Sequence, residues 1–293
     1  MSKIFEALKR AGGEAAEVAL PLIADQSPAT AAADDVVEEA SSPPAAAAAP
    51  AAPAASPLRP QIRTLPIRLS PSAPVLPFDM EESRAGEQYR IIRTKIVQHI
   101  EQPRIMVVSS AGPGDGKTVS ALNISGALSL KNDSNVLLVD ADFRRSNIAD
   151  LLGLDPVPGL AEVLQGTASL EQAVVRVEQF PNLYVLPAGS VASNPTELLD
   201  SPRWTSLCGI FRRQFRFTVL DSPPIGAVAD YDLIQAACDG VLVVVRPDHT
   251  NRPLCLKALQ LTQGKLLGVV MNCVDRWFLW KTQDYYYYSN QKQ

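Results

Sequence analysis

The feature that most constrains this chain is a glycine-rich loop between a strand pattern and a helix pattern. Residues 105–108 form a short apolar run typical of a buried strand, and apolar or small residues recur at helical spacing from Val119 to Leu128. The loop between them reads AGPGDGKT. Its glycines allow backbone N–H groups to turn inward around phosphate oxygens, and the N-terminus of the following helix favours an anion. The sequence therefore predicts a phosphate-binding strand–loop–helix unit.

The end of this loop carries the residue types that a bound nucleotide requires. A lysine at the position of Lys117 reaches the terminal phosphates, and a hydroxyl at the position of Thr118 holds Mg²⁺. Ala111 stands where such loops usually have their first glycine. A chance glycine-rich turn is the alternative, but the strand and helix on either side argue against it. We expect the nucleotide to contact the following residues: Gly112, Gly114, Asp115, Gly116, Lys117, Thr118 and Val119.

Two further apolar runs end in carboxylates. The run from residue 135 to 139 is followed by Asp140 and Asp142, and the run from 217 to 220 is followed by Asp221. Parallel strands deliver their C-terminal residues to the ligand edge of a sheet. We expect Asp140 and Asp142, two residues apart, to point the same way, available for Mg²⁺ or for accepting a proton. Asp221 is the expected second acidic ligand of the metal. A simple polar strand end is the alternative.

The remaining pattern predicts an α/β fold. Further apolar runs cover 182–186, 240–245 and 267–272, and helix patterns cover 81–100 and 253–263. Strands that are continuous apolar runs and alternate with helices indicate a P-loop NTPase-type, mostly parallel sheet with helices on both faces. Residues 61–70 alternate weakly around a proline, which is compatible with an edge strand or a tether.

Composition divides the chain into four parts. Residues 1–12 carry a short amphipathic helix pattern, which is either a frayed terminus or a docking peptide. Half of the 24 prolines precede residue 80, so 13–77 is expected to be a disordered Ala/Pro-rich linker. A folded domain is expected over 78–280, and a flexible tail over 281–293.

Charge and residue counts exclude several classes of function. The net charge of −4 and the sequence pI of about 5.3 offer no field for a polyanion, so nucleic acid is a poor candidate partner. The four cysteines show no CxxC spacing, and the two histidines (His99 and His249) have no ligand partner in the sequence. No stretch approaches eighteen apolar residues. We expect a cytoplasmic protein whose membrane connection, if any, comes through a partner.

The tail holds four of the chain's seven tyrosines in a row, Tyr285, Tyr286, Tyr287 and Tyr288. A terminus is normally mobile and solvated, so packing in a core does not explain them. Such a cluster of aromatic side chains indicates contact or chemistry. A sticky terminal patch, or a strand added to a partner's sheet, is the alternative.

A face of the expected helix over 81–100 carries charges at a spacing of three. Glu87, Arg90 and Arg93 share this face. The ordinary interpretation is a solvated helix face with one intrahelical ion pair.

These motifs together resemble the bacterial tyrosine kinases, the P-loop autokinases of polysaccharide biosynthesis. The likeness covers about 80–288 and rests on AGPGDGKT, VLLVDADFRR, FTVLDSPP and the terminal tyrosine cluster, in that order. The stretches GLAEVLQG, NLYVLPAG and NPTELL also look like that family. The opening MSKIFEALKR is similar to the subgroup associated with exosortase-linked exopolysaccharide loci. The family often has a proline and a histidine after the acidic strand, where this chain has Ser146 and Ala149.

The resemblance implies an ATP- and Mg²⁺-dependent protein-tyrosine autokinase that modifies the tail of a neighbouring subunit. The catalytic residues would be Lys117, Asp140, Asp142 and Asp221, and the metal would be held by Thr118 and the same three aspartates. Asn272 matches the family's asparagine beside the adenine. Tyr285, Tyr286, Tyr287 and Tyr288 would accept phosphate, and Glu87, Arg90 and Arg93 would join subunits into a ring. The implied activator is the cytoplasmic segment of a membrane chain-length-determinant protein.

Two other functions remain open from the residues. A Min- or Par-type positioning ATPase carries an extra lysine early in its loop, where this chain has Gly112, and it would not need a terminal tyrosine run. A nucleotide-binding regulatory subunit of a polysaccharide machine would need no full set of acidic groups. ATP turnover without phosphotyrosine would favour either.

Overall fold

The computed structural model describes residues 62–68, 84–131, 134–262 and 264–273. All of them lie in the compact unit formed by 57–293. The expected helix over 1–12, most of the expected linker over 13–77, and the tail over 281–293 with its four tyrosines lie outside the described residues. Within the described ranges, no helix is both long enough and apolar enough to cross a membrane.

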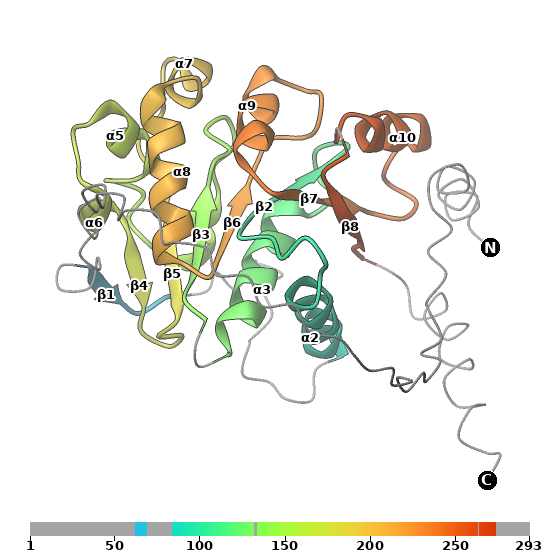
Figure 1. The fold of residues 1–293 in the computed structure, drawn as a ribbon, viewed down its shortest axis with the longest axis horizontal. Helices are drawn as coiled ribbons and strands as arrows, with labels where there is room; N and C mark the ends of the chain where they lie inside the picture. Colours follow the sequence, from blue (N-terminus) through green and yellow to red (C-terminus); the bar gives the residue numbers. More distant parts are fainter. Residues whose placement is uncertain (1–61, 69–83, 132–133, 263, 274–293) are drawn as a thin grey trace, which may run out of the picture. The chain divides into compact units, whose positions relative to one another are not determined.

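The centre of the fold is an eight-stranded sheet (Figure 1). Its strand order is β1-β4-β5-β3-β6-β2-β7-β8, and every neighbouring pair is parallel except β4 with β5. The strands are β1 (Arg63–Leu65), β2 (Ile105–Ser110), β3 (Val136–Asp140), β4 (Val175–Val177), β5 (Leu183–Leu186), β6 (Phe217–Asp221), β7 (Gly240–Val245) and β8 (Leu266–Met271).

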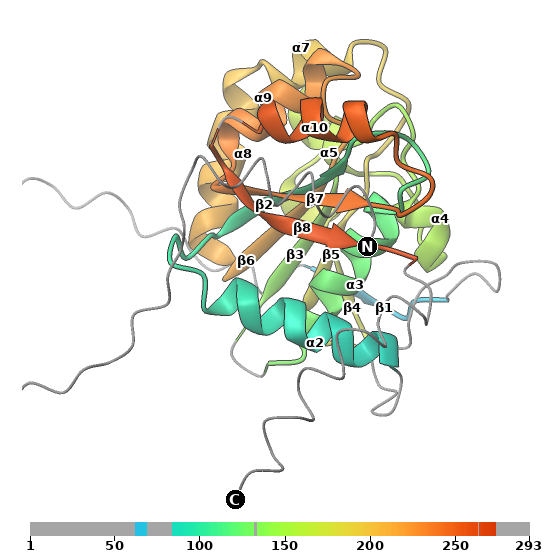
Figure 2. The same ribbon diagram turned by 90° about the vertical axis from the view of Figure 1, so that its right-hand side faces the viewer.

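Helices cover both faces of this sheet. Buried side chains of α2, α3 and α4 pack in one apolar cluster with one face, and those of the other six helices pack in a second cluster on the opposite face. Figure 2 shows α2 and α3 on one side of the strands and α9 and α10 on the other. The helices are α2 (Arg84–Val97), α3 (Lys117–Ser129), α4 (Ile148–Leu152), α5 (Leu160–Gln165), α6 (Leu170–Ala173), α7 (Pro195–Leu199), α8 (Pro202–Gln214), α9 (Ala229–Ala237) and α10 (Arg252–Gln260).

The predicted α/β class is confirmed, and its physical cause is visible in the central strands. Every residue of β2, β3, β6 and β7 is buried, because helices cover both of their faces. This is why these strands appear in the sequence as continuous apolar runs without alternation. The edge strand β8 is only partly buried.

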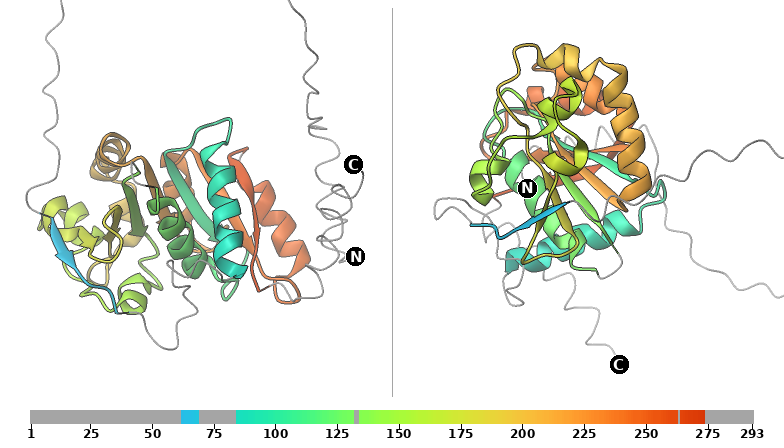
Figure 3. Two further views of the ribbon diagram at one scale, coloured as in Figure 1. Left: turned by 90° about the horizontal axis from the view of Figure 1, so that it is seen from below. Right: turned by 90° about the vertical axis from the view of Figure 1, so that its left-hand side faces the viewer.

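One boundary needs correction. The range 13–77, expected to be a linker, contains β1, which pairs in parallel with β4 at one edge of the sheet (Figure 3). After β1, the side-chain amide of Gln179 both donates to and accepts from the backbone of Ile67, which satisfies polar groups that an edge segment would otherwise expose. Residues 62–68 therefore belong to the folded domain, as the edge-strand interpretation of 61–70 allowed.

The strand order places three carboxyl ends side by side. β6 lies between β2 and β3, and the register pairs Asp140 of β3 with Asp221 of β6. On its other side, β6 pairs with β2, which leads directly into the glycine-rich loop. Since β2 and β3 are joined through α3 but separated by β6, this edge is a point where a ligand can bind between the strands.

Candidate functional site

The glycine-rich loop adopts a backbone that only glycine accepts easily at two positions. Gly114 and Gly116 have φ values of 82° and 91°, in the left-handed region. A Cβ atom on Gly116 would also collide with Nδ2 of Asn272. Gly116 is the residue before α3, so the loop delivers its N–H groups and the start of a thirteen-residue helix to the same place.

The side chain of Asp115 fixes this loop through hydrogen bonds. It is buried, and its carboxylate accepts hydrogen bonds from Thr250 Oγ1 (2.7 Å) and Gly112 N (3.3 Å), while His249 Nδ1 lies 3.0 Å away. Asn272, one residue after β8, donates from Nδ2 to the carbonyl oxygen of Asp115 at 3.0 Å. These contacts connect the loop to the segments that follow β7 and β8. Contact of Asp115 and Asn272 with a nucleotide stays a prediction.

The ammonium group of Lys117 lies among carboxylates at the ends of β3 and β6. Its Nζ atom is 2.8 Å from Oδ2 of Asp142 and 3.6 Å from Oδ1 of Asp221, and it donates to Oγ1 of Thr118 at 3.3 Å. Burial disfavours the charged amine, but the carboxylates of Asp221 and Asp142 outweigh burial and raise the pKa of Lys117. The structure thus brings together four of the predicted site residues.

The third carboxylate, Asp140, is hydrogen-bonded to backbone N–H groups. Its Oδ2 atom accepts from the backbone N–H groups of Asn147 and Ile148, each at 3.1 Å, and its Oδ1 atom accepts from Asp142 N at 3.3 Å. Asp142 has different partners, Arg145 N and Lys117 Nζ, and β3 ends at Asp140, so strand alternation does not extend to Asp142. Asp140 fixes the loop before α4. A role of Asp140 beside the metal stays a prediction.

The cluster holds more negative charge than it neutralises. Burial, with repulsion from Asp221, raises the pKa of Asp140 to about 7. Burial also raises the pKa of Asp221 to about 6, although Lys117 acts in the opposite direction. One partly buried ammonium therefore interacts with three carboxylates, and an added cation would be stabilised here.

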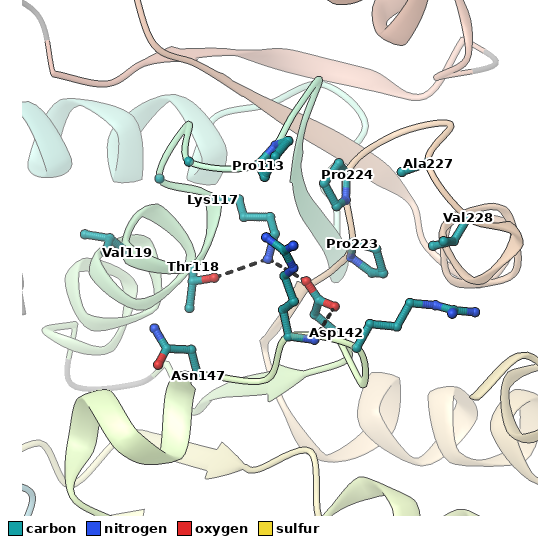
Figure 4. Close-up of a pocket in the computed structure, with 14 residues that line it drawn as sticks. Pro113, Lys117, Thr118, Val119, Asp142, Asn147, Pro223, Pro224, Ala227 and Val228 are labelled. Carbon is teal, nitrogen blue, oxygen red and sulfur yellow. Dashed lines mark hydrogen bonds and ion pairs between the residues drawn. The ribbon is translucent and has the colours of Figure 1, made fainter. Parts of the chain in front are cut away.

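A cavity of about 490 Å³ opens between the loop and the ends of β3 and β6. Figure 4 shows Lys117 and Asp142 between Thr118 and Val119 on one side and Pro223, Pro224 and Val228 on the other. Of the predicted residues, Gly114, Gly116, Lys117, Thr118, Val119 and Asp142 line this cavity, whereas Gly112, Asp115, Asn272, Asp140 and Asp221 are not among its lining residues.

Sequence reasoning did not assign several other residues that line the cavity: Pro113, Arg144, Arg145, Asn147, Pro223, Pro224, Ala227 and Val228. Most of them could have been predicted from the sequence, because they closely follow the acidic residues at the ends of β3 and β6. Ala227 and Val228, just before α9, belong to no motif that would have identified them in the sequence.

Arg144 is held in place by a buried carboxylate from a distant part of the chain. Its Nε and Nη2 atoms donate to Oδ2 and Oδ1 of Asp230 at 2.7 and 3.3 Å. Asp230 lies in the first turn of α9, is 1% exposed, and also accepts from Oγ1 of Thr196 in α7 at 2.6 Å. Burial acts against the charge of Asp230, but the bonds from Arg144 and Thr196 lower its pKa. This contact ties the loop after β3 to α7 and α9.

The donor set fits Mg²⁺ held jointly with a nucleotide. Both carboxylate oxygens of Asp221 are buried without a hydrogen bond. Among the described residues, no three His, Cys, Asp or Glu side chains form a group able to hold a metal by themselves. Mg²⁺ usually takes one or two protein carboxylates and fills its remaining positions with waters and phosphate oxygens. Thr118, Asp142 and Asp221 are sufficient for such a site.

The predicted charged face of α2 is present. Arg90 Nη1 lies 3.1 Å from Glu87 Oε2, which is the intrahelical ion pair of the ordinary interpretation. Arg93 lines a second cavity, of about 500 Å³, together with Lys131 and Phe217. A role of Glu87, Arg90 and Arg93 in self-association stays a prediction.

Known proteins similar to this chain include several tyrosine kinases. No protein-family model matches it. It is 34% identical over 196 residues to the tyrosine-protein kinase CpsD of Streptococcus pneumoniae serotype 4, covering 66% of this chain and 86% of that protein. It is 33% identical over 222 residues to the tyrosine-protein kinase YwqD of Bacillus subtilis, covering 74% and 92%.

Among solved structures, the crystal structure of the chimerical protein CapA2B2 matches with a TM-score of 0.64 and 27% identity, over 68% of this chain and 88% of that one. The phosphate loop, the paired acidic strand ends and these similarities agree with one another. The chain therefore belongs to the bacterial tyrosine-protein kinase family that includes CpsD and YwqD.

Proposed function

We propose that this protein transfers the γ-phosphoryl group of ATP to tyrosines in the tail of a neighbouring copy of the same chain. The observation that carries the proposal is the cluster of the partly buried Lys117 with the buried Asp142 and Asp221 beside the phosphate loop. Such a cluster stabilises charge that moves toward the leaving oxygen, which supplies most of the catalysis in phosphoryl transfer. The row of tyrosines from 285 to 288 supplies the acceptors.

In the reaction, the phenol oxygen of a tail tyrosine forms a bond to the γ-phosphorus. The bond from that phosphorus to the oxygen bridging it to the β-phosphate breaks, and ADP leaves. Lys117 and the N–H groups at the start of α3 stabilise the negative charge on the phosphates. The phenol proton passes to a carboxylate, because a free phenol with a pKa near 10 remains protonated at neutral pH.

Asp142 is the carboxylate best placed to accept that proton. It lines the cavity, whereas Asp140 is bonded to backbone N–H groups and Asp221 is completely buried at the end of β6. Thr118 and Asp221, with Asp142 nearby, would hold Mg²⁺. When bound, the metal supplies positive charge to the β- and γ-phosphate oxygens. Asp140 acts by orienting the loop that carries Asp142.

The wider setting belongs to the same proposal. Residues Glu87, Arg90 and Arg93 would join copies into a ring, and Asn272 would contact the adenine. Activation would come from the cytoplasmic segment of a membrane chain-length-determinant protein, which would place the kinase at the inner face of the membrane. The output would be control of exopolysaccharide or capsule polymerisation, within the exosortase-associated subgroup. Support comes from membership of the tyrosine-protein kinase family and, for a partner protein, from the similar structure of the chimerical protein CapA2B2.

Phosphotyrosine mapping by mass spectrometry tests the proposal. Lys117→Ala should lower tail phosphorylation by at least about a hundredfold, because one preorganised positive charge is lost from the transition state. Equal tail phosphate in the variant and the unaltered chain would contradict an autokinase. ATP turnover without any phosphotyrosine would point instead to a positioning ATPase or a regulatory subunit.

A mixing experiment tests transfer between copies. The catalyst is the full chain with all four tail tyrosines changed to phenylalanine, and the acceptor is the full Lys117→Ala chain. Phosphate on the acceptor's tail is the expected result. An acceptor that stays unmodified, while the unaltered chain modifies itself, would place the transfer within one chain.

A further inference from the structure

The cavity contains three cationic side chains, and their surroundings differ. Lys117 lies between two carboxylates, and Arg144 is bonded to Asp230. Arg145 is exposed, and only its backbone N–H is bonded, to Asp142. Within the described part of the chain, no carboxylate lies within ion-pair distance of the Arg145 guanidinium. Arg145 is therefore able to bind an incoming anion.

The backbone that carries Arg145 is fixed on both sides. On one side, Arg144 is clamped by Asp230, which is itself held by Thr196. On the other, Asp140 accepts from the N–H groups of Asn147 and Ile148. An ion pair from a fixed backbone loses less conformational freedom when it forms.

The opposite wall of the same cavity is apolar. It consists of Pro223, Pro224, Ala227 and Val228, from the connection between β6 and α9 (Figure 4). This wall suits the face of an aromatic ring, whose hydroxyl would then point to the polar floor at Asp142. A residue next to that tyrosine in sequence would then be close enough for a long arginine side chain to bind.

The tail has the matching chemistry. Asp284 directly precedes Tyr285, and each modified tyrosine would add a charge of about −1.5 to −2 beside the tyrosines that remain. We propose that Arg145 and the proline wall form an acceptor subsite that selects a tyrosine adjoining an anionic residue, first Asp284 and then a phosphotyrosine. This inference rests on the proposed kinase function and adds to it the choice of acceptor.

The subsite is assigned to the acceptor because the nucleotide phosphates already have matching groups. The loop N–H groups, the N-terminus of α3 and Lys117 are the groups expected to bind the nucleotide phosphates. Arg145 comes from the loop after β3, lines the same cavity as the proline wall, and donates its backbone N–H to the proposed proton acceptor Asp142. An arginine that binds carboxylates and phosphates alike fits both stages of modification.

The test uses the full chain with its four tail tyrosines changed to phenylalanine as the enzyme. The acceptor is a synthetic peptide of residues 281–293, and phosphotyrosine is quantified against peptide concentration at saturating ATP. Arg145→Gln should raise the peptide KM about fivefold with little change in kcat, as expected for a partly exposed ion pair. Asp284→Asn in the peptide should do the same, and combining the two changes should add little.

A peptide carrying phosphotyrosine at 286 should have a lower KM than the unmodified peptide, and Arg145→Gln should abolish that advantage. Arg145→Lys should recover part of it. The matched control is Arg213→Gln on α8, an exposed arginine that does not line the cavity, and it should leave every peptide KM unchanged.

Two outcomes would overturn the subsite. One is an Arg145→Gln enzyme that still discriminates the unaltered peptide from the Asp284→Asn peptide. The other is a rise in the KM for ATP with an unchanged peptide KM, which would assign Arg145 to the nucleotide. Failure of the proposed function gives a different result, namely no phosphotyrosine on any peptide with the unaltered residue at 145.

Discussion

Two aspartates at opposite ends of the central strands have different surroundings. Asp239, just before β7, accepts hydrogen bonds from the backbone N–H groups of Arg104 (2.8 Å) and Ile105 (2.9 Å), and Arg212 Nη1 lies 2.6 Å from its other oxygen. Asp221, at the end of β6, is completely buried, and neither of its oxygens accepts a hydrogen bond. The first carboxylate is satisfied by the protein, and the second is not.

The pKa shifts of the two groups follow from this difference. Burial acts to raise both values, but the N–H bonds and Arg212 lower the pKa of Asp239, whereas the pKa of Asp221 rises to about 6. A carboxylate such as Asp239, whose two oxygens both accept hydrogen bonds from the protein, stabilises the folded state. A carboxylate such as Asp221, buried beside one ammonium group but without a hydrogen bond, costs stability, which is typical of groups that act on a ligand.

The largest expected effect is on catalysis, from Asp221→Asn. Phosphotyrosine formation should fall by at least about a hundredfold, because the carboxylate proposed for the metal is lost. Thermal unfolding should occur at the same temperature or higher, since one of three crowded negative charges is removed. Circular dichroism melting and phosphotyrosine quantification check the two parts. A strongly destabilised protein would show that Asp221 supports the fold after all.

The reverse result is expected for Asp239→Asn. The free energy of unfolding should fall by about 2 kcal/mol, because hydrogen bonds to a charged, mostly buried group are weakened. Tail phosphorylation per folded molecule should stay unchanged, since Asp239 lies at the N-terminal ends of the strands and the candidate site lies at their C-terminal ends. Urea denaturation measures the first, and the kinase assay on the folded protein measures the second. A loss of catalysis without a loss of stability would break the comparison.

The two sites should also differ in their response to pH. Folding raises the pKa of Asp221 to about 6 and of Asp140 to about 7 from 3.8, so the folded chain holds a proton that the unfolded chain has released. Stability from this cluster should therefore fall as pH rises from about 4 to about 7, by at most about 1.4 kcal/mol per pH unit per proton. Asp239 has a lowered pKa, so its contribution is present above 3.8 and disappears as pH falls below that value.

Urea unfolding in buffers from pH 3 to 8, without added Mg²⁺, separates these slopes. Asp221→Asn should flatten the decline between pH 4 and 7, and Asp239→Asn should weaken the loss at the acid end. Identical pH profiles for both variants and the unaltered chain would contradict the assignment.

The smallest effect sharpens the comparison at the ligand edge itself. Asp115 lies in the phosphate loop, yet its carboxylate is satisfied like that of Asp239, by Thr250, His249 and Gly112. Thr250→Val should cost about 1 kcal/mol of unfolding free energy, with kcat within about a factor of two of the original. Thermal melting and steady-state kinetics measure both. A large fall in kcat would mean that the location of Asp115 in the phosphate loop, and not its satisfied hydrogen bonds, decides whether it takes part in catalysis.

Much of the fold could be predicted from the sequence. The runs at 105–108, 217–220 and 240–245 coincide with β2, β6 and β7, because strands buried on both faces must be apolar throughout. The three-residue strand β4 and the antiparallel pairing of β4 with β5 could not be predicted, since a run of three residues has no distinctive periodicity. For the same reason β1 was distinguishable from a tether only through its pairing with β4.

For the candidate site, the sequence alone located the phosphate loop and the acidic strand ends, because a phosphate loop is built from contiguous residues and strand ends follow their strands. Only the tertiary structure decided which carboxylates keep unsatisfied oxygens. Thr250 is 135 residues from Asp115, and Asp230 is 86 residues from Arg144. Such partners meet only when the sheet assembles, so the roles of these charged groups depend on hydrogen bonds that no local pattern records.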